Sequence, residues 1–412
     1  MGNNVGPNCV QCVYRRNSLM RSKFLTFLLT ATLIVVPVST SHALLRAEQI
    51  PSVFAELTNA KALANPSMVL IDLSNGQTIY SRDANGLRKP ASTLKLMSAF
   101  SSLEYLPEDK QFTTTIYKTD IKNVFQIVGD YDPSISPSLK LAKNLNFVWS
   151  DNLVGQIRKV AQQKYLKIRN YGLTARTRTN MNNTFRRAGY HITWESISED
   201  QALSHVTDPL YSATSPKLPQ ILHYTLLFSD NWVADYLAKS AAAAAGYGYN
   251  AAGISTVFND VLTKYNITDG KLNVVDGSGL SHDNRITTQT LAQVLVAMKN
   301  NPKFAPAIAG LPVGGISGTL QHRFIKSAPE AIGLVHAKTG SINGVVSLAG
   351  YVESGDHEYI FAIIADHLAR NYATESAARA AIDKLLAKIA APLQIATAPE
   401  VTPTPSPESS AA

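Results

Sequence analysis

Two strand pairs near opposite ends of the chain most constrain its fold. Between Ser67 and Tyr80, two short β-prone runs flank Ser74-Asn75-Gly76, which is typical of a hairpin turn. Val345–Val352 and Tyr359–Ala365 form a second pair of this kind. An apolar stripe at helical spacing follows it, made of Ala378, Ile382, Leu385 and Ile389. We therefore predict an α+β fold in which a mainly antiparallel sheet is flanked by helices.

The chain between these strand pairs changes character twice. Short strand-like runs lead into a polar, basic stretch at Lys159–Arg187, and we predict that residues 106–203 form a small inserted domain. Apolar residues return at helical spacing from Leu218, and Trp232–Ala245 has the pattern of another helix, ended by Gly246. The main domain is therefore expected to be discontinuous, with residues 44–105 and 204–392 and an all-helical side beside its sheet.

The two ends of the chain carry signals of their own. A basic segment precedes the apolar run Phe24–Val38 and the small residues that end at Ala43, so residues 1–43 are predicted to be a signal peptide. We expect export to the periplasm or the extracellular cell-wall space. No second apolar run of that length follows, so a further membrane span is not expected. Residues 393–412 are rich in Pro, Ser and Thr and are predicted to be a disordered tail.

Cysteine content and charge exclude some classes of function. Cys9 and Cys12 both precede the apolar run, so the exported chain is expected to hold no disulfide. Loss of the first 43 residues lowers the net charge from +8 to +4, because they contain no acid and four basic residues: Arg15, Arg16, Arg21 and Lys23. Basic residues do not cluster among aromatic ones, so nucleic acid is not an expected partner.

Ser92-Thr93-Leu94-Lys95 is the first of three short motifs that carry chemistry. It stands at the start of a helical pattern, so Ser92 and Lys95 are expected on one face, where the ammonium can reach the hydroxyl. The amides at a helix N-terminus also favour negative charge near the serine. Lys95 can act as a base only while it is neutral, a state that desolvation and a second nearby cation both promote.

The other two motifs supply further groups for such a site. Lys338-Thr339-Gly340 ends a strand-like run, where it offers a charge and a hydroxyl to a substrate carboxylate and lets a ligand backbone approach closely. Ser229-Asp230-Asn231, between two predicted helices, offers a hydroxyl for proton relay and an amide for orientation. Ser150-Asp151-Asn152 repeats the second pattern. Each motif alone also fits a helix cap or a strand end, so their order in one chain is the stronger signal.

Together the motifs resemble those of the penicillin-binding protein and serine β-lactamase superfamily. More closely, they resemble the low-molecular-mass D-Ala-D-Ala carboxypeptidase/endopeptidase family, which carries an insertion after the first motif. The resemblance implies a transpeptidase/β-lactamase-like fold, and it selects Ser229 over Ser150. Four longer stretches extend it over most of residues 60–370: Gly129-Asp130-Tyr131-Asp132-Pro133, Asp276-Gly277-Ser278-Gly279-Leu280-Ser281 with Asn284-Arg285, Leu311-Pro312-Val313 through Gly318-Thr319-Leu320 to Arg323, and Ala337-Lys338-Thr339-Gly340.

The resemblance also implies a role for each residue. Ser92 would attack the carbonyl between the two terminal D-alanines of a peptidoglycan stem peptide, Lys95 would take its proton, and Ser229 would relay a proton to the leaving amine. Water would hydrolyse the acyl-enzyme, so neither a metal nor an organic cofactor is expected, and β-lactam antibiotics would be covalent inhibitors. The residues implied in substrate binding are Asn231 for the amide, Lys338 and Thr339 for the terminal carboxylate, Gly340 beside them, and Ser341, whose N–H with that of Ser92 would bind the oxyanion.

Three alternatives bear on this interpretation. A β-lactamase shares the motifs, but the best-known class needs a glutamate between the second and third motifs, and no Glu lies between Glu199 and Glu330. A class without that residue stays open, as does a non-catalytic peptidoglycan-binding or β-lactam-sensing module. A Ser-His-Asp hydrolase is disfavoured because the chain has no G-x-S-x-G sequence. The insertion is shorter than the family's usual one, which leaves the choice between carboxypeptidase and endopeptidase open.

Overall fold

The computed structural model describes residues 49–267 and 271–390. The predicted signal peptide, residues 1–43, and the predicted tail, residues 393–412, lie outside the described residues. None of the helices within the described ranges is long and apolar enough to cross a membrane.

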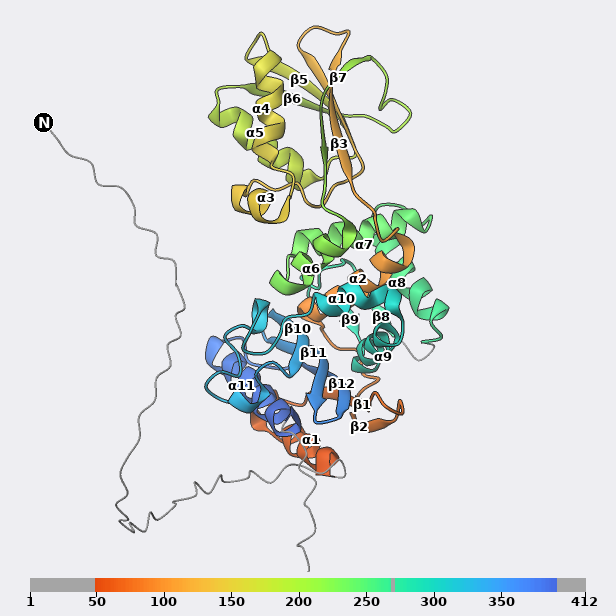
Figure 1. Ribbon diagram of the computed structural model, residues 1–412, viewed down its shortest axis with the longest axis vertical. Helices are drawn as coiled ribbons and strands as arrows, with labels where there is room; N and C mark the ends of the chain where they lie inside the picture. The colour runs from red at the N-terminus through yellow and green to blue at the C-terminus, as the bar shows by residue number, and fades with distance from the viewer. Residues whose placement is uncertain (1–48, 268–270, 391–412) are drawn as a thin grey trace, which may run out of the picture. The chain divides into compact units, whose positions relative to one another are not determined.

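A five-stranded antiparallel sheet built from both ends of the chain organises the main domain (Figure 1). This confirms the predicted antiparallel sheet and both predicted strand pairs. The strand order is β10-β11-β12-β1-β2, so β10 lies at an edge. The strands are β1 (Ser67–Asp72), β2 (Thr78–Arg82), β10 (Val335–Ile342), β11 (Val345–Ser354) and β12 (His357–Ala365).

Helices cover both faces of this sheet, as its alternating apolar side chains require. On one face Met68 and Leu70 pack against α1 and α11, which buries the predicted stripe of α11. On the other face Val69 and Ile71 join a core that is filled by the remaining helices of the main domain. Those elements are α1 (Ile50–Thr58) and α11 (Tyr372–Ala390) on the first face, and α2 (Lys95–Tyr105), α6 (Leu218–Phe228), α7 (Asn231–Ala244), α8 (Ala251–Lys264), α9 (Thr288–Lys299) and α10 (Ala305–Ala309) on the second.

A second, mixed sheet with its own core follows α2 in the chain. Its order is β6-β5-β4-β3-β7, with β4, β5 and β6 parallel to one another. Its elements are β3 (Thr113–Thr119), β4 (Val124–Gly129), α3 (Leu139–Leu145), α4 (Ser150–Val160), β5 (Tyr165–Tyr171), α5 (Ala175–Arg187), β6 (His191–Ser196) and β7 (Val206–Thr214). Strand β7 lies beyond residue 203, the boundary expected for the inserted domain. It contains Pro209, which weakens a strand signal in a sequence but is tolerated at a sheet edge.

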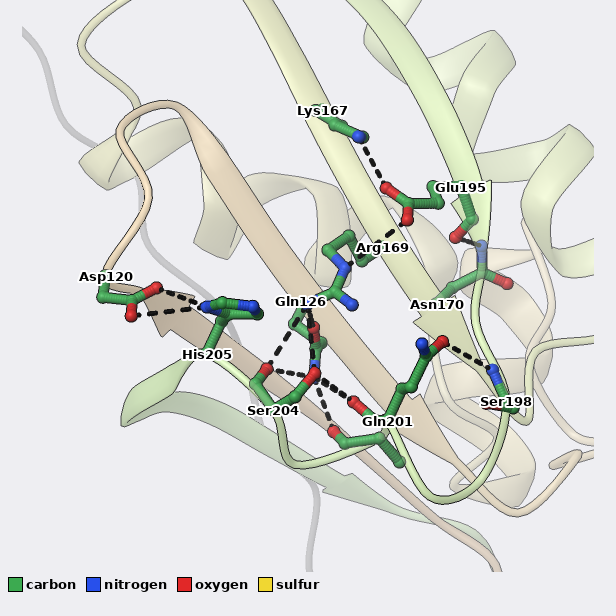
Figure 2. A network of polar contacts seen from close by, with 11 residues as sticks. Asp120, Gln126, Lys167, Arg169, Asn170, Glu195, Ser198, Gln201, Ser204 and His205 are labelled. Carbon is green, nitrogen blue, oxygen red and sulfur yellow. Dashed lines mark hydrogen bonds and ion pairs between the residues drawn. The ribbon is translucent and has the colours of Figure 1, made fainter.

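A buried amide fastens the segment between β6 and β7 to the polar face of the second sheet (Figure 2). The Gln126 side chain is fully buried, and its Nε2 donates to the carbonyl oxygens of Gln201 (3.3 Å), Ala202 (2.6 Å) and Ser204 (3.1 Å). Its Oε1 accepts a hydrogen bond from Arg169 Nη1 at 2.9 Å. The two N–H groups of one side chain therefore reach three backbone carbonyls of this irregular segment, including the buried carbonyl of Ala202.

Short elements complete the main domain around the motifs. They are the 3₁₀ segments Lys61–Leu63, Ala91–Leu94, Pro302–Phe304, Gly318–Leu320 and Pro329–Ala331, and the small strands β8 (Leu272–Asn273) and β9 (Arg285–Ile286).

Candidate active site

Ser92 is half-buried in the 3₁₀ segment Ala91–Leu94, which leads directly into α2. The chain before it is fixed by Arg88, whose side chain is 7% exposed and pairs with Asp83 and, at 2.9 Å, with Asp366. The backbone N–H of Lys89 donates to the other oxygen of Asp366 at 3.1 Å. The end of β12 therefore holds the turn that presents Ser92.

Two glycines let other segments approach this turn closely. Gly279 has a φ of +80°, and a Cβ there would lie 1.8 Å from the carbonyl oxygen of Ala91. A Cβ at Gly340 would lie 2.8 Å from the carbonyl oxygen of Pro90 and 3.1 Å from the Ser92 nitrogen. Only glycine permits these contacts, so the Gly of the third motif places the edge strand β10 directly against the Ser92 turn.

Lys95 is fully buried and forms three hydrogen bonds within the described residues. Its Nζ donates to Ser92 Oγ at 2.8 Å, to Asn231 Oδ1 at 2.6 Å and to the carbonyl oxygen of Ser278 at 2.6 Å. Burial lowers the pKa of Lys95 from 10.5 to about 7, against the opposing influence of the Asp276 and Asp230 charges. The amine is therefore aligned on the serine hydroxyl and neutral for part of the time near pH 7.

Lys338, on β10, is a second fully buried lysine. Burial and the charge of Lys95 lower the pKa of Lys338 well below its usual value. Its Nζ donates to the carbonyl oxygen of Thr339 at 2.9 Å. The Thr339 hydroxyl points away to another loop, where it donates to Thr319 Oγ1 at 2.7 Å.

The second motif joins α6 to α7. Ser229 ends α6 in the left-handed region, with a φ of +60°. Asp230 caps α7 by accepting the N–H groups of Trp232 (2.9 Å) and Val233 (3.0 Å), and this capped first turn carries Asn231 to Lys95. Ser229 is not among the hydrogen-bond partners of Lys95 within the described part of the chain. Ser150, in the repeated motif, begins α4 beside the second sheet, and Asp151 accepts the Thr184 hydroxyl there at 2.6 Å.

The Asp276–Ser281 segment contributes to the site in a way that sequence reasoning did not assign. Asp276 Oδ1 accepts the N–H groups of Ser278 and Gly279, both at 2.7 Å, and its Oδ2 accepts that of Ser281 at 2.9 Å. Burial opposes ionisation, but these hydrogen bonds prevail and keep the pKa of Asp276 below its usual value. The turn so formed aims the Ser278 carbonyl at Lys95. An Asp followed by Gly, Ser and Gly is a turn signal, although the signal does not name the contact.

A cavity of about 370 Å³ adjoins the site beside Asn231. It is lined by α7 and by the Asp276–Ser281 segment, with Trp232, Asp235, Lys239 and Leu280 among its walls. Within residues 49–267 and 271–390, no group of three or more His, Cys, Asp or Glu side chains is placed to hold a metal ion.

Solved structures share this fold. Penicillin binding protein 4 from Haemophilus influenzae superposes with a TM-score of 0.64 over 81% of this chain and 98% of that one, at 17% sequence identity. A predatory endopeptidase from Bdellovibrio bacteriovorus, in complex with an immunity protein, gives a TM-score of 0.55 over 80% of this chain and 95% of that one, at 16% identity.

Curated relatives match in sequence over a shorter part of the chain. The penicillin-sensitive carboxypeptidase A of Dictyostelium discoideum is 36% identical over 171 residues, which is 38% of this chain and 31% of that protein. The D-alanyl-D-alanine carboxypeptidase of Actinomadura sp. is 36% identical over 157 residues, 37% of this chain and 29% of that protein. The matched part of this chain thus spans less than a third of the length of these relatives.

The family comparison extends further along the chain than these pairwise matches. The model of the D-Ala-D-Ala carboxypeptidase 3 (S13) family matches residues 52–147 and 148–389, which include all three motifs and both sheets. The site described above therefore lies on the scaffold of that family. The chain belongs to the D-Ala-D-Ala carboxypeptidase 3 (S13) family.

Proposed function

We propose that the protein is an exported serine-type D-Ala-D-Ala carboxypeptidase that acts on peptidoglycan stem peptides through an acyl-enzyme on Ser92. The observation that carries the proposal is the position of the buried Lys95 amine, which lies 2.8 Å from Ser92 Oγ. Burial lowers the pKa of Lys95 to about 7. Membership of the family and the names of the curated relatives support the choice of substrate. The periplasm or extracellular wall space is the compartment in which such a substrate is met.

Acylation begins at Ser92. Neutral Lys95 takes the hydroxyl proton as Oγ attacks the carbonyl carbon between the two D-alanines, so one C–O bond forms and the carbonyl oxygen becomes an oxyanion. The backbone N–H groups of Ser92 and Ser341 stabilise that oxyanion, which in acyl transfer is usually the largest electrostatic contribution.

The tetrahedral intermediate then collapses to the acyl-enzyme. Ser229 relays the proton from Lys95 to the amine, the C–N bond breaks, and D-alanine leaves. Water attacks the ester in a second cycle, and Lys95 again takes and returns one proton. Asn231 holds the substrate amide, while Lys338, Thr339, Gly340 and Ser341 form the strand edge along which the carboxylate end lies.

The proposal is tested by covalent labelling with a fluorescent penicillin. We expect a stable adduct that peptide mapping locates at Ser92 and that is absent from Ser92→Ala. Ser150→Ala, which changes the serine of the repeated motif, serves as the control and should label normally. Labelling that persists in Ser92→Ala would refute the proposal, and rapid release of hydrolysed penicillin from the wild type would indicate a β-lactamase.

The bond that is cleaved requires a second assay. Carboxypeptidase and endopeptidase action both start at the carbonyl of the same D-alanine, so the geometry of Ser92 and Lys95 suits either. Incubation with a pool of muropeptides separates them. Release of free D-alanine shows the first activity, and loss of crosslinked dimers shows the second.

A further inference from the structure

Arg379, on α11, reaches the end of the strand that carries the third motif. Its Nη2 donates to Ser341 Oγ at 2.8 Å and to Glu375 Oε2 at 3.1 Å. The other oxygen of Glu375 accepts the N–H of Gly344, in the turn between β10 and β11, at 3.1 Å. Arg379 is thus held by Glu375 at the strand end, and among the described residues both side-chain contacts of the guanidinium use the same nitrogen. Its Nε and Nη1 remain available to a ligand.

Strand alternation places Thr339 and Ser341 on the same face of β10, and Ser341 lies beside this guanidinium. Gly340 faces the Ser92 turn, whereas Thr339 and Ser341 face the opposite side of β10, on which α11 packs. Ser341 is exposed and Thr339 is partly exposed, and β10 is an edge strand, so all three groups can be reached from solvent. The Arg379 guanidinium and the Ser341 hydroxyl therefore lie together at the strand edge directly beyond Gly340, whereas the Thr339 hydroxyl donates to Thr319.

The carboxylate of the proposed substrate requires a positively charged partner. A substrate that ends in D-alanine presents a carboxylate, and the sequence suggested Lys338 as its partner. Lys338 is fully buried, however, its Nζ already donates to the Thr339 carbonyl, and its pKa is lowered well below the usual value by burial and by Lys95. Arg379 offers a planar guanidinium, and its side chain is 29% exposed.

We propose that Arg379 is a specificity-determining residue that, with the hydroxyl of Ser341, binds the C-terminal carboxylate of the stem peptide. The planar guanidinium matches a carboxylate, and Glu375 holds it in place before the substrate arrives. The inference rests on the proposed function and names the group that makes the enzyme select peptides with a free carboxylate.

The test compares two forms of one peptide, ending either in D-Ala-D-Ala or in D-Ala-D-alaninamide. Arg379→Ala should lower kcat/KM for the acid about 10- to 100-fold, the range of a charge-assisted hydrogen bond, and leave the amide nearly unchanged. Arg379→Lys should fall between. Arg370→Ala is the matched control, because Arg370 is exposed, its stem lies against Gly344, and its loss removes the same charge near the same turn.

Equal losses on the acid and the amide would overturn the inference, because they would mean that Arg379 only supports α11 and β10. An Arg379→Ala variant whose kcat/KM is unchanged for both peptides would overturn it as well. If the wild type cleaved neither peptide, the proposed function itself would fail. Equilibrium binding of the two peptides to Ser92→Ala, with and without Arg379→Ala, would then decide the inference. Loss of the preference for the acid supports it, and a retained preference refutes it.

Discussion

The rate at which Ser92 is acylated should follow the neutral fraction of Lys95. Burial lowers the pKa of Lys95 from 10.5 to about 7. At pH 7 about half of the molecules therefore hold the free base, compared with about one in 3,000 for an ordinary lysine. Burial thus supplies about a thousandfold more of the reactive form. We expect the rate constant to rise about tenfold per pH unit below pH 6, to reach half its maximum near pH 7, and to level off above pH 8.

A charge-removing substitution tests the cause of this profile. The Asp230 and Asp276 charges favour protonated Lys95, so removal of one should lower the pKa of Lys95 and move the rising limb to lower pH. Asp230→Asn suits this purpose because the asparagine oxygen can still cap α7 by accepting the Trp232 and Val233 amides. Asp208→Asn, an exposed position in β7, removes the same charge elsewhere and should leave the profile in place.

Stopped-flow acylation by a fluorescent penicillin, measured from pH 5 to pH 9 at constant ionic strength, gives the profile. A rate that is flat over this range would refute Lys95 as the base, and so would a limb that rises only near pH 10. A limb that moves to higher pH in Asp230→Asn would contradict the assigned sign of the Asp230 charge.

Three further predictions concern stability. Lys95→Met should abolish acylation and raise the melting temperature, most of all below pH 7. The gain should shrink as pH rises from 7 to 10.5, because Lys95 keeps its proton through that range in the unfolded wild-type chain but not in the folded one. Gly279→Ala should lower the free energy of unfolding by more than the about 1 to 2 kcal/mol that a left-handed alanine costs, because its Cβ would meet the Ala91 carbonyl. Gly76→Ala is the control in the same chemical unfolding experiment. Gly76 has a φ of +72° and nothing within 4 Å of its Cβ position, so this change should cost only the backbone strain. Gln126→Ala should destabilise the protein by about 2 kcal/mol, because the buried Ala202 carbonyl loses its donor. It should also make residues 198–205 more susceptible to limited proteolysis without changing Ser92 acylation. Equal protease resistance would contradict the fastening described for Figure 2.

Features that depend on neighbouring residues were predictable from the sequence. The hairpin at Ser67–Tyr80 follows from two β-prone runs around an Asn-Gly turn, and the buried stripe of α11 follows from a period of 3.6 residues; both are local signals. The contact between Ser92 and Lys95 has the same origin, because a spacing of three residues at a helix start brings the two groups together wherever that helix lies.

The rest of the candidate site depends on residues far apart in the chain. The Ser278 carbonyl and Asn231 complete the surroundings of Lys95 from other segments, and Arg379 meets Ser341 across the sheet face that α11 covers. No local pattern marks such contacts, since each follows from packing between whole elements. The burial of a side chain also depends on packing between elements that lie far apart in the chain. The sequence shows two lysines in suitable motifs, but only the folded core removes Lys95 and Lys338 from water and so lowers the pKa of both amines.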